Sequence, residues 1–195
     1  MQRNYKHNLI KQVQTQLSRG APFDLPALRR LGVSPQLAAQ YVKGGWLVRL
    51  AQGVYAFPND VLDPLAALRF LQTPGPGLHV AGKSALALQG VRHNLGTRAP
   101  WLLWGDTRFT LPGWFTSRFP ARYVSAKLFD WPDDALPAKT LTTPPGMTEG
   151  VQVSVPERAL LELLYEVGTH QSLEEARQLF ESLRGAGLLH PASAV

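Results

Sequence analysis

The chain has 195 residues, of which 45% are hydrophobic and 17% charged, and it contains no cysteine. This length suits one large domain or two small ones with a real core, and the missing thiols exclude disulfides, cysteine-ligated zinc and thiol nucleophiles. No apolar run approaches the roughly 20 residues that span a bilayer, and the N-terminus, MQRNYKHNLIKQ, lacks the apolar core of a signal peptide. We therefore expect a cytoplasmic protein.

The net charge of +6 is concentrated in the first third of the chain. Residues 1 to 58 hold eight lysines and arginines against a single aspartate, whereas the remaining residues hold twelve basic and thirteen acidic side chains. A basic surface can be merely solvated, but such asymmetry is typical of a domain whose partner is a polyanion. The first third is therefore the candidate for nucleic-acid binding.

Three short helices are predicted in this basic region. Apolar side chains recur at helical spacing over residues 8 to 19 and again over residues 24 to 31, where Gly32 ends the second helix. The third helix covers residues 35 to 43, because Ser34 is a favourable N-cap and a proline at the first helical position costs no hydrogen bond. Only two residues separate the second helix from this cap, so the pair predicts a helix-turn-helix.

The third helix has an apolar and a polar face. The apolar stripe, expected to be buried, comprises Leu37, Ala38, Tyr41 and Val42. The polar face, with the exposed N-terminus, comprises Ser34, Gln36, Gln40 and Lys43. Glutamine can form a paired hydrogen bond with adenine N6 and N7, whereas lysine more often holds a phosphate. This face is the predicted recognition surface for a DNA major groove.

A β-hairpin is predicted directly after the third helix. Strand-forming residues 46 to 48 and 54 to 57 flank a turn that contains Gln52 and a glycine. Arg49 and Gln52 are expected near the tip of this hairpin, where a wing reaches the DNA backbone or the minor groove. We therefore predict that residues 1 to 60 form a winged helix-turn-helix domain.

Residues 61 to 195 are predicted to form a second, mixed α/β domain, which makes the whole chain an α+β protein. Helices are expected at residues 63 to 71, 82 to 90, 156 to 167 and 172 to 183, and strands at residues 78 to 81, 101 to 104, 122 to 129, 139 to 143 and 151 to 155. Residues 188 to 191 resemble the start of a further helix. We therefore expect a chain that is truncated at its C-terminus.

Residues 91 to 129 interleave aromatic and basic side chains. The aromatics can fill the core of a sheet while the basic groups stay in water, or both kinds together can stack on bases and bind phosphates. We favour the first interpretation. On the second, the basic surface would comprise Arg92, Arg98, Arg108, Arg118, Arg122 and Lys127.

Residues 77 to 84, GLHVAGKS, match the P-loop pattern G-x-x-x-x-G-K-[ST]. A phosphate-binding loop follows a buried strand directly, but TPGPG stands at that place, which favours an ordinary strand-to-helix turn. The only apolar run that ends in an acid able to hold magnesium is residues 101 to 106. Nucleotide binding therefore remains only an alternative.

No catalytic or metal-binding constellation emerges from the sequence. The five histidines have no ligand spacing with one another or with acids, and Ser84 lacks the histidine and aspartate of a triad. Glu157, Arg158 and Glu162 share a helix at a spacing that indicates solvated or ion-paired faces rather than an acid/base pair. We expect no metal, no cofactor and no enzymatic activity.

Three segments occur in a characteristic order: GGWLVRLAQGVYAFP, HVAGKSALALQG and VSVPERALLELL. Together they resemble the AbiEi family of type IV toxin–antitoxin antitoxins, which combine an N-terminal winged helix-turn-helix with a C-terminal antitoxin domain. The resemblance covers nearly the whole chain and is most specific at RLAQGVYAF and PERALLELL. It implies DNA contacts at Ser34, Gln36, Gln40, Lys43, Arg49 and Gln52, the positions that the helix and hairpin also indicate.

The resemblance further implies a repressor of its own operon, bound to inverted repeats in double-stranded promoter DNA. It also implies an antitoxin of phage defence by abortive infection, which neutralises a co-encoded nucleotidyltransferase-like toxin without a stable complex. Relatives often continue into a further basic C-terminal region. Two alternatives stay open: a plain winged-helix regulator whose second domain senses a ligand or dimerises, and a nucleotide-dependent protein that uses residues 77 to 84.

Overall fold

The computed structural model describes residues 2–73, 77–91, 99–130, 139–144, 146–147 and 150–189, and for residues 2–7 the backbone alone. Its contacts divide the chain into two compact units, residues 1–70 and 71–195. The division falls after Phe70, within helix α4 (Pro64–Gln72), whereas the sequence places the boundary at residue 60. Helices and two separate sheets make the chain a mixed α+β protein, as predicted.

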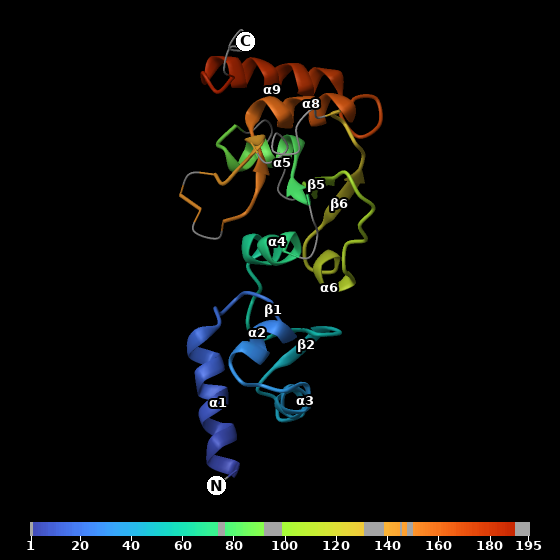
Figure 1. Ribbon diagram of the computed structural model, residues 1–195. Coiled ribbons are helices and arrows are strands. Elements are labelled where there is room, and N and C mark those ends of the chain that lie inside the picture. The colour runs from blue at the N-terminus through green and yellow to red at the C-terminus, as the bar shows by residue number, and fades with distance from the viewer. Residues whose placement is uncertain are drawn as a thin grey trace. The chain divides into compact units, whose positions relative to one another are not determined.

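The N-terminal unit follows the order helix, strand, helix, helix, strand, strand (Figure 1). These elements are α1 (Gln2–Gln16), β1 (Phe23–Asp24), α2 (Leu25–Arg30), α3 (Pro35–Lys43), β2 (Val48–Ala51) and β3 (Val54–Ala56). The strands form an antiparallel sheet in the order β1-β3-β2. The three predicted helices and the hairpin are confirmed, whereas the short strand β1 is not predicted by the sequence.

One apolar core holds this unit together. Leu28 of α2 and Ala38 of α3 are fully buried in it, and the rings of Phe23 and Phe57 lie 5.1 Å apart. Tyr41 is only 5% exposed, so its predicted place in the core is confirmed. Burial of each large side chain contributes roughly 1.5–3 kcal/mol, and α3 is therefore held in one orientation by its packing.

The C-terminal unit is built on a five-stranded sheet. Its elements are β4 (His79–Val80), α5 (Gly82–Leu88), β5 (Trp101–Gly105), α6 (Gly113–Thr116), β6 (Ala121–Ser125), β7 (Leu141–Thr142), β8 (Val153–Ser154), α8 (Pro156–Tyr165) and α9 (Leu173–Gly185). The strand order is β6-β5-β4-β8-β7. The central strands β4 and β8 are parallel, and each leads directly into a helix, α5 or α8. Helix α5 packs on α8, and α8 packs on α9 (Figure 1).

Most predicted elements of this unit are present, although every strand except β5 is shorter than expected. The aromatic side chains do fill a core: Trp104 and Phe115 are fully buried, and Trp104 Nε1 donates to the Ala126 carbonyl at 2.8 Å. The short helix α6 is not predicted by the sequence. Of the helix expected from residue 188, Leu188 and Leu189 are not helical, and the rest lies outside the described residues. Within the described ranges, no helix is both long and apolar enough to cross a membrane.

Candidate DNA-binding surface

Helix α3 is fixed at both ends by its own sequence. The Ser34 hydroxyl oxygen accepts a hydrogen bond from the Leu37 N–H at 3.2 Å, and a cap of this kind contributes about 1 kcal/mol. At the other end, the Gly44 N–H donates to the Gln40 carbonyl at 2.9 Å. Gly45 then adopts a φ of 72°, a conformation that glycine tolerates best. Strong local signals therefore define the length of the helix.

Burial of one face of α3 leaves the predicted recognition residues at the surface. Ser34, Gln36, Gln40 and Lys43 are all exposed. Gln36, Gln40 and Lys43 are spaced by four and three positions, so their side chains form one row along the helix. The structure thus gathers this part of the predicted set on a single face.

The wing differs in detail from its prediction. The β2–β3 hairpin closes through Gln52 and Gly53, a two-residue turn in which Gly53 has a φ of 73°. Gln52 is exposed at this turn, as predicted. Arg49 is not at the tip, because the turn is shorter than expected and Arg49 lies within β2, paired with Tyr55. Its exposed side chain, whose Nε donates to the Ala51 carbonyl at 3.3 Å, reaches solvent from the strand.

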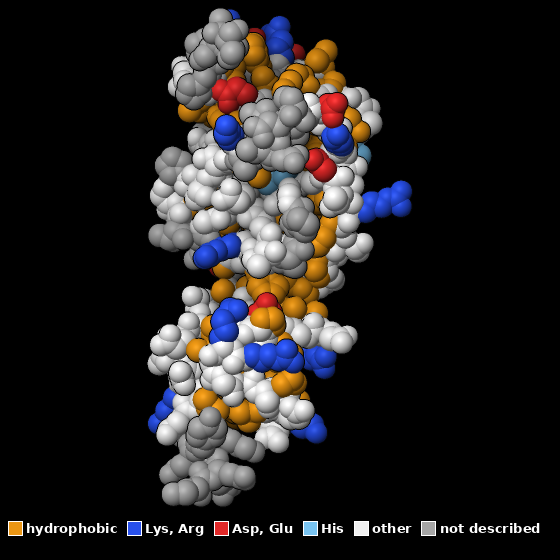
Figure 2. Space-filling view, in the orientation of Figure 1, with side chains coloured by type: hydrophobic (Ala, Val, Ile, Leu, Met, Phe, Trp, Pro, Cys, Tyr) orange, Lys and Arg blue, Asp and Glu red, His pale blue; other side chains and the backbone are white. Residues whose placement is uncertain are grey.

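The N-terminal unit carries all of the net charge. Residues 1–70 hold nine basic and three acidic residues, and residues 71–195 hold eleven of each. On the face shown in Figure 2, lysine and arginine side chains are spread over the N-terminal unit with little acidic surface among them, whereas basic and acidic side chains both occur over the C-terminal unit. The concentration of charge that the sequence indicates therefore coincides with a folded unit.

The three acids of this unit have structural roles. Asp24 caps α2 by accepting from the Ala27 N–H at 2.8 Å, and Asp63 accepts two backbone N–H groups at the start of α4 at 2.9 Å. Asp60 pairs with Arg19 at 2.5 Å and accepts the Gly20 N–H at 2.8 Å. No acidic residue lies on α3 or in the hairpin. The row on α3 thus presents no carboxylate to a polyanion.

Two arginines on the first helix of the helix-turn-helix are absent from the predicted set. Arg29 and Arg30 form the exposed last turn of α2, directly before the turn into α3. Trp46, between α3 and β2, is 42% exposed. The outward positions of the arginines can be read from the helical pattern, but nothing in the sequence distinguishes an exposed Trp46 from a buried strand residue.

In the C-terminal unit, Glu162 is fully buried and accepts four hydrogen bonds. Its Oε1 lies 2.9 Å from His79 Nε2 and 2.8 Å from Arg158 Nε, and its Oε2 accepts from the Ser154 hydroxyl at 2.7 Å and the Gly82 N–H at 3.1 Å. Burial by itself raises the pKa of Glu162, but His79, Ser154 and Arg158 together hold it below its ordinary value. An ionised carboxylate therefore ties β4, β8, α5 and α8 together.

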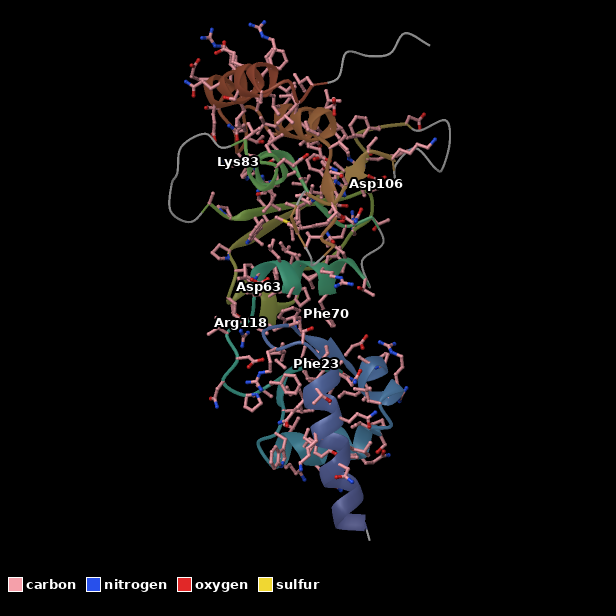
Figure 3. The ribbon with its side chains drawn as sticks, turned by 90° about the vertical axis from the view of Figure 1, so that its left-hand side faces the viewer. Phe23, Asp63, Phe70, Lys83, Asp106 and Arg118 are labelled. Atoms are coloured by element: carbon pink, nitrogen blue, oxygen red, sulfur yellow. The ribbon has the colours of Figure 1, made fainter. Side chains whose placement is uncertain are left out.

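This carboxylate also bears on the P-loop alternative. The Gly82 N–H, which would face a phosphate in a P-loop, donates to Glu162, and Lys83 lies 3.7 Å from Glu175. Because β5 runs antiparallel to β4, Asp106 follows the end of β5 that is remote from α5, and Figure 3 shows Lys83 and Asp106 on different sides of the unit. The segment is an ordinary strand-to-helix turn, and its contacts argue against nucleotide binding.

The predicted second basic surface is partly neutralised. Its six residues are Arg92, Arg98, Arg108, Arg118, Arg122 and Lys127, of which the first two lie outside the described residues. Arg122 forms an ion pair with the buried Glu166, and Lys127 pairs with Asp130 at 2.8 Å. Arg108 is exposed. Among the residues described, no three histidine or acidic side chains gather as metal ligands would.

The N-terminal unit is a winged helix-turn-helix of the kind found in transcriptional regulators. Its elements follow the order helix, strand, helix-turn-helix pair and β-hairpin, and it holds the net positive charge of the chain. The family is equally clear: the chain belongs to the AbiEi antitoxins. Residues 6–97 match the family described as "Transcriptional regulator, AbiEi antitoxin N-terminal domain", and residues 99–189 match "Transcriptional regulator, AbiEi antitoxin, Type IV TA system". The predicted family is thus confirmed over nearly the whole chain.

Among solved structures, the chain is similar to the RV2827C protein from Mycobacterium tuberculosis, with 18% identity and a TM-score of 0.48. That similarity covers 85% of this chain and 67% of the other. A search of curated protein sequences gave no match. The family descriptions name a transcriptional regulator and an antitoxin of a type IV toxin–antitoxin system, and they name no catalytic activity.

Proposed function

We propose that this protein represses its own operon by binding double-stranded promoter DNA, and that it acts in the cytoplasm as the antitoxin to a co-encoded toxin. The observation that carries the DNA-binding half is the row of Gln36, Gln40 and Lys43 on α3, whose opposite face is locked into a core. This row lies in the unit that holds all of the net positive charge. A rigid helix with an exposed polar row suits the major groove.

Each residue of the surface has a proposed role. Gln36 and Gln40 would contact base edges, and Lys43 would hold a phosphate from the last turn of α3. Ser34, at the N-terminus of the helix, would meet a phosphate together with the positive end of the helix dipole. The wing would add Arg49 from β2 and Gln52 from the turn, against the backbone or the minor groove.

Phosphate contacts would supply most of the affinity. Each neutralised phosphate contributes about 0.9 to the slope of log affinity against log salt, so binding should weaken steeply between low and physiological salt. Inverted repeats in the promoter would be read by two copies of the unit. The exposed Arg29 and Arg30 at the end of α2 are further candidates for backbone contacts.

For the antitoxin half, we infer that the partner is a nucleotidyltransferase-like toxin encoded beside this gene, neutralised without a stable complex. Membership of the AbiEi family of type IV systems supports this inference. The remaining basic side chains of the C-terminal unit could take part. Arg108 is the better residue for testing a role in neutralisation. Arg122 is already paired with Glu166, so its replacement would also remove a structural ion pair.

Co-expression with the neighbouring gene tests both halves of the proposal together. Growth would be scored with the toxin alone and with the toxin and this chain, while a reporter measures the operon promoter. We expect restored growth and repression. A promoter that is repressed without any rescue of growth, or a locus without a toxin gene, would instead favour a plain winged-helix regulator with a ligand-sensing or dimerisation domain.

A further inference from the structure

We propose that α3 selects A·T base pairs and that Ala39 is a specificity residue, which contacts the 5-methyl group of thymine while Gln36 and Gln40 contact adenine. This inference rests on the proposed DNA binding, and it specifies the base chemistry that the same surface reads. It also adds to the recognition set a residue that polar patterning alone passes over.

Ala39 lies inside the polar row of α3. It follows Gln36 by three positions, precedes Gln40 directly and precedes Lys43 by four, so all four side chains share one face. Ala39 is exposed, whereas its neighbour Ala38 is fully buried. The methyl group of Ala39 is therefore a small apolar contact surface between two amides.

The two kinds of side chain match the two members of one base pair. In the major groove, adenine offers the N7 acceptor and the N6 donor that a glutamine amide can bond in pairs, and thymine offers a methyl group suited to alanine. The residues that most often read guanine and cytosine are arginine, aspartate and glutamate, and the α3 sequence PQLAAQYVK contains none of them. Lys43, which could also read guanine, stands at the last helical position.

The dimensions of the helix are consistent with reading neighbouring base pairs. At a rise of about 1.5 Å per residue, Gln36 and Gln40 are separated by about 6 Å along the axis. Successive bases of one strand are about 3.4 Å apart. The two amides therefore reach base pairs roughly two steps apart, and Ala39 faces the pair between or beside them.

The test uses the full chain and chemically altered DNA. Binding sites would first be selected from a pool of duplexes with a random central region, and the selected duplex would then be synthesised with uracil in place of thymine or 7-deazaadenine in place of adenine. Uracil removes only the methyl group, and 7-deazaadenine removes only the N7 acceptor. A duplex altered outside the selected site controls for general effects on DNA structure.

We expect A·T-rich half-sites and a wild-type affinity that falls about fourfold for each contacted thymine methyl, the equivalent of one buried methylene. Ala39→Gly should bind the thymine and uracil duplexes equally, and Gln40→Ala should lose only the part of the 7-deazaadenine sensitivity that its own amide supplies, while the part supplied by Gln36 remains. Each comparison is made within one variant, so a general loss of affinity cancels. If Ala39→Gly melts early, the wild-type and Gln40→Ala arms still decide.

Three results would overturn the inference: G·C-rich selected sites, equal wild-type affinity for thymine and uracil duplexes, or an Ala39→Gly variant that remains as sensitive to uracil as the wild type. In each of these cases the protein still binds DNA, so the proposed function survives. A wild-type chain that selects no duplex at any salt concentration would instead refute the DNA-binding proposal itself.

Discussion

Replacing Glu162 by glutamine tests the carboxylate that joins the elements of the C-terminal unit. If the amide oxygen takes the Oε1 position, it still accepts from His79 and Arg158. The amide NH₂ then takes the Oε2 position, which accepts the Gly82 N–H at 3.1 Å in the wild type, so two donors face each other there. Leaving that buried donor unsatisfied costs about 1–3 kcal/mol. The loss of charge also weakens the bond from Arg158, since charge-assisted bonds are roughly twice as strong as neutral ones.

We therefore expect Glu162→Gln to lower the free energy of unfolding of the C-terminal unit by about 2–4 kcal/mol, close to the roughly 3–5 kcal/mol typical when one partner of a buried ion pair is removed. Denaturant titration monitored by tryptophan fluorescence measures this value, because Trp101, Trp104 and Trp114 all lie in that unit. Glu181→Gln is the matched control, since Glu181 is 56% exposed and pairs with Arg177 at 3.6 Å.

The control should change stability by less than about 0.5 kcal/mol. Equal unfolding midpoints for Glu162→Gln and Glu181→Gln would refute the reasoning. Replacing a buried acceptor of four hydrogen bonds must lower the free energy of unfolding more than replacing a surface residue does. The backbone N–H of Gly82 is a direct probe of the same point. Its amide exchange should accelerate in Glu162→Gln beyond the change seen at neighbouring amides of α5.

Three further predictions concern the same unit. Because the folded-state pKa of Glu162 is lowered, the stability that its ionised carboxylate contributes is fully present above the unfolded pKa of about 4.3 and is lost as the pH falls through the folded pKa. The difference in unfolding free energy between wild type and Glu162→Gln should therefore shrink as the pH is stepped down below the unfolded pKa in denaturant titrations, and a constant difference would contradict this. Gly82→Ala should lower the free energy of unfolding by about 1–3 kcal/mol, as measured by thermal melting, because φ at Gly82 is 46° and the new Cβ would lie 2.8 Å from Leu102 Cδ2. Gly113→Ala, where nothing lies within 4 Å of the new Cβ, is the control, and its destabilisation must be clearly smaller. Calorimetric titration with ATP and magnesium should show no binding to wild type or to Lys83→Ala, whereas binding that Lys83→Ala abolishes would revive the P-loop.

Helix α3 could be predicted from the sequence because the signals that begin and end it are local. Ser34 caps an N–H three residues away, and the glycines that end α3 act within one turn. The division into a buried and an exposed face follows from helical spacing alone, which is why Tyr41 is placed correctly in the core. Ala39 shares the exposed face, but an alanine gives no polar signal by which to notice it.

The features that the sequence does not reveal depend on distant partners. The strand β1 exists because Phe23 and Asp24 pair with Tyr55 and Val54, across some thirty residues of chain. Arg49 moves from the tip into β2 because the hairpin register is set by β3 and by a bulge, not by β2 alone.

Glu162 shows the same limit in the second unit. Of the two interpretations of its spacing from Arg158, the ion pair is correct. The solvated face is wrong, because the carboxylate is fully buried. One of the partners of the buried carboxylate is His79, which is 83 residues away in the chain. No pattern within α8 could supply that contact, and only the pairing of β4 with β8 brings the two residues together.

The central claim is that the row on α3 binds promoter DNA, and it is tested most directly by titrating a fluorescent duplex of the operon promoter at several salt concentrations. Gln40→Ala should weaken binding by about 1–3 kcal/mol, and Lys43→Ala should weaken it and reduce the salt slope by about 1, both with unchanged melting temperatures because the two side chains are exposed. Gln14→Ala and Lys11→Ala, on the exposed side of α1, are matched controls in the same unit. Unchanged affinity in both α3 variants, or losses equal to those of the α1 controls, would contradict the account.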